Sequence, residues 1–278
     1  MKQLRRQLGA VRRRLSHYRQ LATSRLRHHR NKQRHLRLYK PDISRAPDRD
    51  RQASFVQDGV VVVRDFLPKD VVEQIVTEVR PSVEAVADNR YVGPLRTLTG
   101  DEGGLFRLYN VDESLAPSSR AFFRSAFIAD LADSVCRPGM HSADRYVDYK
   151  ANGGRDKTLA YHIDHWKVRF KAFLLLQDVT DDHAPFVYVK GSHRDDGWRR
   201  RWDWGYQHKE TAGSLLPPDE VRKICRRFGY QEQVFTGAAG DLIIADTRGI
   251  HRGNLLKRGT RLQLVHLYKM NGPEDYAC

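Results

Sequence analysis

The sequence predicts a mainly β protein with flanking helices, built as an antiparallel β-sandwich or jelly roll. Beyond Asp144, short apolar segments bounded by Gly, Asp or Pro follow one another as expected for strands. Two segments with helical periodicity precede them, and helices followed by strands are typical of helices packed on an antiparallel sheet. At 278 residues and 40% hydrophobic, the chain can build the core of one large β domain.

The first 41 residues differ in composition from the rest. They contain fourteen of the 49 Lys and Arg residues and none of the 34 acidic residues, so residues 42–278 carry 35 basic against 34 acidic groups. We predict a basic amphipathic helix over residues 1–41, followed by a folded domain over residues 42–278. One face of the helix is apolar: Leu4, Leu8, Val11, Leu15, Tyr18 and Ala22.

This basic extension has several possible roles. It could bind an anionic membrane surface, nucleic acid or a helical partner, or it could be a solvated extension without a partner. The apolar stripe adds burial at a membrane that a nucleic-acid-binding tail does not need, so we rank membrane association above nucleic-acid binding. It is no secretory signal peptide because an unbroken apolar region is missing, whereas an organellar transit peptide would share its composition.

The helices are expected near the start of the folded domain. Residues 55–59 predict a short helix that ends at a glycine turn, followed by a buried strand over Val60–Val63. Helical periodicity continues through Pro68–Asp88, and Ser118–Cys136 forms a second helical region. The strands expected after these helices are Arg145–Lys150, Val168–Gln177, Phe186–Val189, Asp241–Ala245 and Arg261–Tyr268.

Two protein classes are excluded by composition. No apolar run approaches the roughly 18 residues that a membrane span needs. The three cysteines, Cys136, Cys225 and Cys278, are widely spaced and form neither a CxxC metal clamp nor an even disulfide set. A reducing compartment is therefore favoured, and we expect a cytoplasmic protein.

A metal site is predicted around His162 and Asp164. In an extended segment, residues two apart project from the same face, so this imidazole and carboxylate can bind one ion. His251 follows the strand Asp241–Ala245 and is the best candidate for a third ligand. Two histidines and one carboxylate form the facial triad of non-haem Fe(II) oxygenases. Three other histidines are interpreted as structural: His165, His193 and His266.

An arginine strengthens this interpretation. Arg261 lies ten residues after His251 at the start of the next strand. Its guanidinium offers a fixed fork to a carboxylate, which an oxygenase using 2-oxoglutarate requires for the distal end of that cosubstrate.

The ordered motifs resemble the phytanoyl-CoA dioxygenase-like family of Fe(II)/2-oxoglutarate-dependent oxygenases. The resemblance covers about residues 52–270. The matching runs are FVQDGVVVVRDFLP, HIDH, FLLLQDVTDDHAPF, VKGSHR and GDLIIAD, followed by the His-Arg-Gly turn at His251 and by Arg261.

The resemblance implies a double-stranded β-helix fold of the cupin-like, jelly-roll type. It implies Fe(II) bound by His162, Asp164 and His251, 2-oxoglutarate held by Arg261, and O₂ as the oxidant. Lys150 matches a lysine often found near the cosubstrate. Some members place a serine two residues after the distal histidine, where this chain has a glycine at position 253. Since relatives that halogenate lack the carboxylate ligand, the presence of Asp164 favours hydroxylation.

The segment Arg194–Glu210 is a candidate lid over the site. Three of the four tryptophans, Trp198, Trp202 and Trp204, alternate there with arginines. Aromatic faces beside guanidinium groups suit a polar or anionic small-molecule substrate, although the tryptophans could equally pack the segment onto the barrel.

We therefore predict a dioxygenase that hydroxylates a small molecule and releases succinate and CO₂. Two alternatives remain open at this point. One is a non-catalytic binding module that acts through its basic N-terminal helix, and the other is a metal enzyme of the same fold that does not use 2-oxoglutarate.

Overall fold

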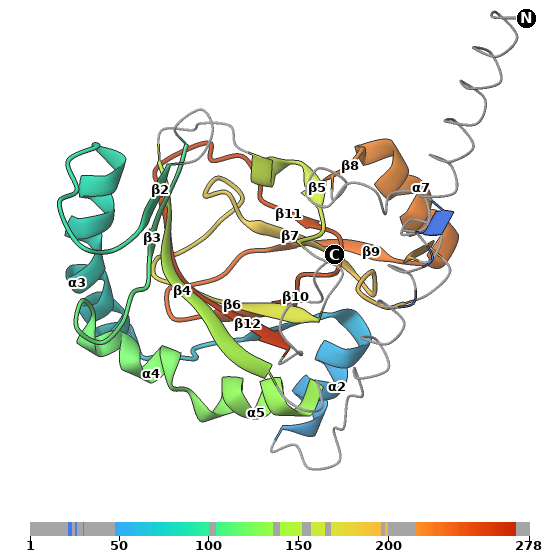
Figure 1. The fold of residues 1–278 in the computed structure, drawn as a ribbon, viewed down its shortest axis with the longest axis horizontal. Helices are drawn as coiled ribbons and strands as arrows, with labels where there is room; N and C mark the ends of the chain where they lie inside the picture. The colour runs from blue at the N-terminus through green and yellow to red at the C-terminus, as the bar shows by residue number, and fades with distance from the viewer. Residues whose placement is uncertain are drawn as a thin grey trace, which may run out of the picture.

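Two antiparallel β-sheets form the frame of the protein (Figure 1). They pack face to face, because one apolar cluster joins Tyr146 and Phe173 of the larger sheet to Tyr188 and Phe235 of the smaller one. This arrangement confirms the predicted sandwich or jelly roll. The computed structural model describes residues 22–23, 26, 30, 48–99, 104–135, 140–151, 157–164, 168–195, 198–199 and 215–270.

The larger sheet has seven strands in the order β1-β10-β6-β12-β4-β3-β2. All six strands expected from the sequence are present, five of them in this sheet and one in the smaller sheet. The longest pairing joins β4 to β12 and places Lys150 directly opposite Arg261. The strands are β1 (Val60–Val63), β2 (Thr97–Thr99), β3 (Leu105–Tyr109), β4 (Met140–Lys150), β6 (Arg169–Leu175), β10 (Leu242–Asp246) and β12 (Arg261–Met270).

The smaller sheet has five strands in the order β8-β5-β11-β7-β9. Its central strands are short, and the β11–β5 pairing consists of His251 opposite His162. The smaller sheet therefore brings together two of the predicted ligands. The strands are β5 (Tyr161–His162), β7 (Phe186–Lys190), β8 (Leu215–Leu216), β9 (Gln231–Phe235) and β11 (His251–Arg252).

Side-chain alternation divides the larger sheet into two faces. On β6, Phe170, Ala172 and Leu174 belong to the apolar cluster under the helices. The intervening Phe173 and Leu175 belong to the cluster between the sheets. Because successive residues of a strand point to opposite faces, residue 171 of β6 also faces the interior of the barrel.

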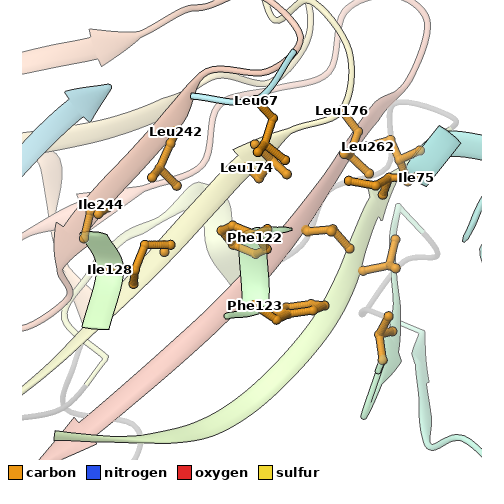
Figure 2. Close-up of a cluster of buried hydrophobic side chains, with 14 of the residues drawn as sticks. Leu67, Ile75, Phe122, Phe123, Ile128, Leu174, Leu176, Leu242, Ile244 and Leu262 are labelled. Atoms are coloured by element: carbon orange, nitrogen blue, oxygen red, sulfur yellow. The ribbon is translucent and has the colours of Figure 1, made fainter. Parts of the chain in front are cut away.

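Helices cover the outer face of the larger sheet, as Figure 1 shows for α2 to α5. Figure 2 shows Ile75, Phe122 and Ile128 from three of these helices in one buried cluster with Leu174 and Ile244 of the sheet. These side chains are almost completely buried, and each such side chain stabilises the fold by roughly 1.5–3 kcal/mol. The helices are α2 (Arg49–Asp58), α3 (Lys69–Ala87), α4 (Arg120–Phe123), α5 (Ala126–Val135) and α7 (Pro218–Phe228), with 3₁₀ turns at Pro117–Ser119 and Lys157–Leu159.

The N-terminal helix–turn–strand prediction is confirmed. Helix α2 ends at Gly59, whose φ of 80° lies in the left-handed region that glycine adopts without strain. A Cβ at this position would lie 2.4 Å from both His193 Nδ1 and the Tyr188 hydroxyl, so the turn also requires a residue without a side chain.

The helical region expected over Ser118–Cys136 is present as a 3₁₀ turn and two helices, which are interrupted at Arg124 and Ser125. The helical prediction was incomplete in one place. Helix α7 interrupts the part of the chain in which nearly every segment was expected to be a strand. The predicted basic helix lies almost entirely outside the described residues, of which Ala22, Thr23, Leu26 and Arg30 are helical. No helix among the described residues is long and apolar enough to cross a membrane.

One buried histidine belongs to the core under the helices. His266 lies on the outer face of β12, has no exposed surface, and packs edge-on against Phe122 and Phe123. Its Nε2 atom lies 2.7 Å from the Ser142 hydroxyl. Burial lowers the pKa of His266 to about 3, so the folded protein keeps this ring neutral.

We expect this histidine to make the protein sensitive to acid. Between pH 6.5 and pH 3 the unfolded chain binds a proton at His266 that the folded chain does not, so stability falls as the pH falls. From pH 7 to pH 5, the free energy of unfolding of the wild type should fall by about 2 kcal/mol more than that of His266→Phe. Urea unfolding at both pH values measures the difference, and parallel pH profiles would contradict the prediction.

Candidate metal centre and cosubstrate site

His162 and His251 meet across the smaller sheet. They are direct partners in the β5–β11 pairing, and their ring centroids are 4.3 Å apart. His251 is buried, and the His162 side chain is 16% exposed. The alternation of side chains along the strands turns both rings toward the interior of the barrel.

Asp164 completes the group. Its backbone N–H donates to the carbonyl of Thr247, 2.9 Å away, which holds the segment after β5 against the loop before His251. Asp164 Oδ1 lies 3.8 Å from His162 Nε2 and 3.7 Å from His251 Nε2. All three ligand atoms lie within 4.8 Å of one another, and no other such group occurs in the part of the chain that the structure describes. The structure thus brings the three predicted ligands together.

Backbone carbonyls orient both imidazoles. His162 Nδ1 lies 2.8 Å from the Ala160 carbonyl, and His251 Nδ1 lies 2.9 Å from the Gly249 carbonyl. Because a carbonyl only accepts, each Nδ1 carries the proton and each Nε2 presents its lone pair to a metal. Burial, followed by the neighbouring His251, lowers the pKa of His162 to about 4, so this ring is neutral at pH 7.

An apolar cluster supports the triad from behind. Ile163, between the first two ligands, and Ile250, just before the third, point away from the metal centre into this cluster. Trp198 and two residues of α7, Val221 and Ile224, fill the other side. The helix that the sequence reading missed therefore packs against the segments that carry the ligands.

A partly buried lysine pairs with the carboxylate of the triad. Lys171 projects from β6 into the barrel, and its Nζ atom lies 2.7 Å from Asp164 Oδ2. Burial would raise the pKa of Asp164, but Lys171, His251 and His162 together outweigh burial and hold this pKa well below its ordinary value. The aspartate is therefore a carboxylate at neutral pH, as a metal ligand must be.

Arg261 is the first residue of β12 and is 6% exposed. Its Nη1 atom donates to the Ala184 carbonyl at 2.5 Å, and its Nη2 atom lies 3.2 Å from Asp148 Oδ2. Asp148 also accepts from Arg107 Nε at 3.1 Å and from Gln263 Nε2 at 2.9 Å. Burial would raise the pKa of Asp148, but Arg107 and Arg261 outweigh it and lower this pKa.

Lys150 stands beside Arg261. The two residues are cross-strand partners, and Lys150 is 1% exposed. Its Nζ atom lies 3.5 Å from the Asn254 carbonyl. A Cβ at Gly253 would lie 3.1 Å from Thr158 Oγ1 and 3.6 Å from Lys150 Nζ. A hydroxyl and an ammonium therefore border Gly253.

The remaining candidates are structural or lie outside the described residues. His193 Nε2 donates to the Val56 carbonyl at 3.0 Å, and His266 belongs to the outer core, so neither approaches the triad. In the candidate lid, Trp198 is 3% exposed and packs in the apolar cluster, which agrees with the packing alternative for this residue. His165, Trp202 and Trp204 lie outside the described residues.

Sequence reasoning missed three residues of the site: Lys171, Asp148 and Arg107. Each is a charged residue at an inward position of a strand whose neighbours are mostly apolar or aromatic. An isolated charge in such a strand is a signal for a buried polar site, because an unpaired buried charge is strongly unfavourable. The sequence does not indicate which residue pairs with such a charge. Asp148 and Arg261, for example, are 113 residues apart.

Comparison with known proteins agrees with this geometry. Residues 55–254 match the family model of phytanoyl-CoA dioxygenase (PhyH). No curated protein matches the chain significantly. Among solved structures, EctD from S. alaskensis with bound 2-oxoglutarate and 5-hydroxyectoine is 17% identical with a TM-score of 0.59, and the match covers 84% of this chain and 79% of that chain.

Two further structures share the fold. The epimerase SnoN, in complex with Fe³⁺, α-ketoglutarate and nogalamycin RO, is 20% identical with a TM-score of 0.56, over 79% of this chain and 82% of that chain. HygX from Streptomyces hygroscopicus, with nickel and 2-oxoglutarate bound, is 15% identical with a TM-score of 0.55, over 81% of this chain and 87% of that chain. The expected double-stranded β-helix is confirmed, and the match over residues 55–254 shows that the chain belongs to the phytanoyl-CoA dioxygenase family.

Proposed function

We propose that His162 Nε2, Asp164 Oδ1 and His251 Nε2 bind Fe(II) in an Fe(II)/2-oxoglutarate-dependent dioxygenase. The observation that carries this proposal is the convergence of two imidazoles and one carboxylate within 4.8 Å. This donor set suits Fe(II) and leaves one face of an octahedral ion open. Family membership supports the same activity.

Arg261 and Lys150 are proposed to bind the carboxylate of 2-oxoglutarate that lies away from the metal. Two like charges directly opposite each other on neighbouring strands destabilise a sheet, and here both are buried. An anion between them would offset this repulsion. Asp148 orients the guanidinium, and the Thr158 hydroxyl borders the same space beside Gly253.

The expected reaction is hydroxylation of a small molecule. When bound, iron and 2-oxoglutarate supply the oxidation: one oxygen atom of O₂ enters succinate as CO₂ is lost, and the other enters the substrate. The chain's own residues keep the ligands deprotonated and oriented, anchor the cosubstrate and enclose both in the barrel. The presence of Asp164 supports hydroxylation, because the carboxylate takes the position that halogenating relatives leave for a halide.

The substrate is proposed to be polar or anionic. Four cations and two carboxylates are joined by the contacts of the site: Arg107, Lys150, Lys171 and Arg261 against Asp148 and Asp164. The two charges of Fe(II) and the two of 2-oxoglutarate cancel, so an excess of positive charge remains for the substrate. The small molecules named with EctD and SnoN support a small-molecule substrate here as well.

Anaerobically reconstituted protein with Fe(II), 2-oxoglutarate and O₂ tests the activity. Succinate should form slowly without substrate and faster with the right member of a metabolite panel that pairs anionic compounds with neutral analogues. A protein that binds neither Fe(II) nor 2-oxoglutarate would refute the proposed activity. Stimulation confined to neutral compounds would refute the proposed substrate class.

The basic extension is proposed to bring the enzyme to anionic membrane surfaces. This proposal rests on the fourteen cations and the apolar stripe of residues 1–41. Each Lys or Arg near such a surface contributes about 1 kcal/mol at most, and salt screens the attraction over ~8–10 Å. The full chain should sediment with anionic liposomes at low salt and less at high salt, whereas residues 42–278 should remain in solution. Equal sedimentation of both proteins would refute this role.

A further inference from the structure

Lys171 occupies a position where the fold would accept an apolar residue. It lies between Phe170 and Ala172 in the middle of β6, which is flanked by β10 on one side and β12 on the other. Its side chain is 17% exposed and points into the barrel toward Asp164. A buried ion pair is often no more stable than an apolar replacement, so stability alone gives little reason for a lysine here.

The two oxygens of the Asp164 carboxylate face different partners. Oδ1 faces the imidazoles, at 3.8 Å from His162 Nε2 and 3.7 Å from His251 Nε2. Oδ2 faces Lys171 Nζ at 2.7 Å. Rotation about the last bond of an aspartate side chain is only weakly restricted, so without a partner either oxygen, or both, could face the metal.

We propose that Lys171 is a positioning residue that holds Asp164 as a one-oxygen ligand of the metal. The inference rests on the proposed Fe(II) site. An octahedral ion with three protein ligands and two oxygens of a chelating 2-oxo acid has one position left. A carboxylate that bound through both oxygens would occupy that position, which O₂ needs. By engaging Oδ2, Lys171 keeps the position available.

The surroundings of Lys171 agree with this role. Besides Asp164, the titratable groups that interact with it include Tyr146 of β4, Arg107 of β3 and His162 of β5. Arg107 is itself bound to Asp148, which in turn contacts Arg261. The lysine has one carboxylate partner among these groups, and that partner is the metal ligand.

The test measures binding of Mn(II) alone to the full chain. Without Lys171 both oxygens of Asp164 are free to bind the ion, and a neighbouring positive charge is gone, so Lys171→Met should bind Mn(II) more tightly than wild type. A change of about 10-fold is expected, the lower end of the 10- to 100-fold effects of residues that orient a metal ligand. Lys171→Gln keeps a hydrogen-bond donor for Oδ2 and should change the affinity less. Lys190→Met is the matched control, because Lys190 forms a 2.6 Å ion pair with Asp58 away from the triad.

A second readout reports the coordination itself. The Fe(II) chelate of 2-oxoglutarate absorbs visible light, and under anaerobic conditions this absorption should shift or weaken in Lys171→Met but not in Lys190→Met. Unchanged affinity and absorption in Lys171→Met would overturn the positioning role. Absence of Mn(II) binding by the wild type would overturn the proposed metal centre instead. If Lys171→Met does not fold, Lys171→Ala replaces it, and wild-type affinity and absorption in that variant would overturn the positioning role.

Discussion

Replacing His162 by alanine is expected to remove metal binding and with it succinate formation. The imidazole is neutral at pH 7 because burial lowers its pKa to about 4, and the Ala160 carbonyl holds Nδ1 so that Nε2 faces the metal. The variant keeps two ligands of three. Because altering a residue that only orients a ligand already costs 10- to 100-fold in affinity, losing the ligand itself should cost more than about 100-fold.

Titration of the metal-free variant with Mn(II) and assay of succinate release with Fe(II) measure these losses. His141→Ala is the matched control, since His141 is an exposed histidine of β4 outside the triad. Thermal unfolding of the metal-free proteins checks that both variants fold. If His162→Ala retained Mn(II) affinity within threefold of the control, the assignment of this residue as a ligand would be wrong.

The pair of His162 and Asp164 could be predicted because its geometry is local. Residues two apart in an extended segment share a face, which places His162 beside Asp164 without any knowledge of the tertiary structure. His251 could be added because it follows a buried strand. The pairing of His251 with His162 depends on how the smaller sheet is assembled, and only the structure shows it.

The cluster around Asp148 could not be predicted in the same way. Its ion pairs reach Arg107, 41 residues earlier, and Arg261, 113 residues later. Such pairs depend on sheet order, because β3 and β12 both neighbour β4 only in the folded protein. The spacing of residues in the sequence does not show which strands will be neighbours in the sheet.

Helix α7 was missed although its termini carry ordinary signals. Two acidic residues lie in its first turn, two arginines lie in its last, and Gly229 ends it with a φ of 69°. The prediction failed because the neighbouring segments of the sequence have the short apolar pattern that is typical of strands. The helix supports the proposed metal centre, since its residues Val221 and Ile224 pack in one cluster with Ile163 and Ile250.

Replacing Arg261 by leucine is expected to weaken 2-oxoglutarate binding while metal binding persists. The Arg261 guanidinium is buried and is proposed to bind the distal carboxylate. Removing one member of a buried, hydrogen-bonded charge pair costs about 2–5 kcal/mol of binding free energy. A loss of at least about 30-fold in cosubstrate affinity follows. Mn(II) affinity should stay within threefold of wild type, because Arg261 is not a ligand.

The substitution should leave the fold intact. Asp148 loses one partner but keeps Arg107 at 3.1 Å and Gln263 at 2.9 Å, so its carboxylate remains paired. Arg261→Lys keeps the charge without the fork and should recover part of the affinity. Arg258→Leu serves as the control, because Arg258 forms an exposed ion pair with Asp182 just before the same strand.

Equilibrium titration of 2-oxoglutarate into the Mn(II)-loaded proteins distinguishes the remaining interpretations. Loss of affinity in Arg261→Leu alone supports Arg261 as the anchor. Equal affinity in Arg261→Leu and wild type would move the anchor to Lys150, its cross-strand partner, whose replacement by methionine would then abolish binding. A wild-type protein that binds Mn(II) but no 2-oxoglutarate would be a metal enzyme of this fold with a different cosubstrate.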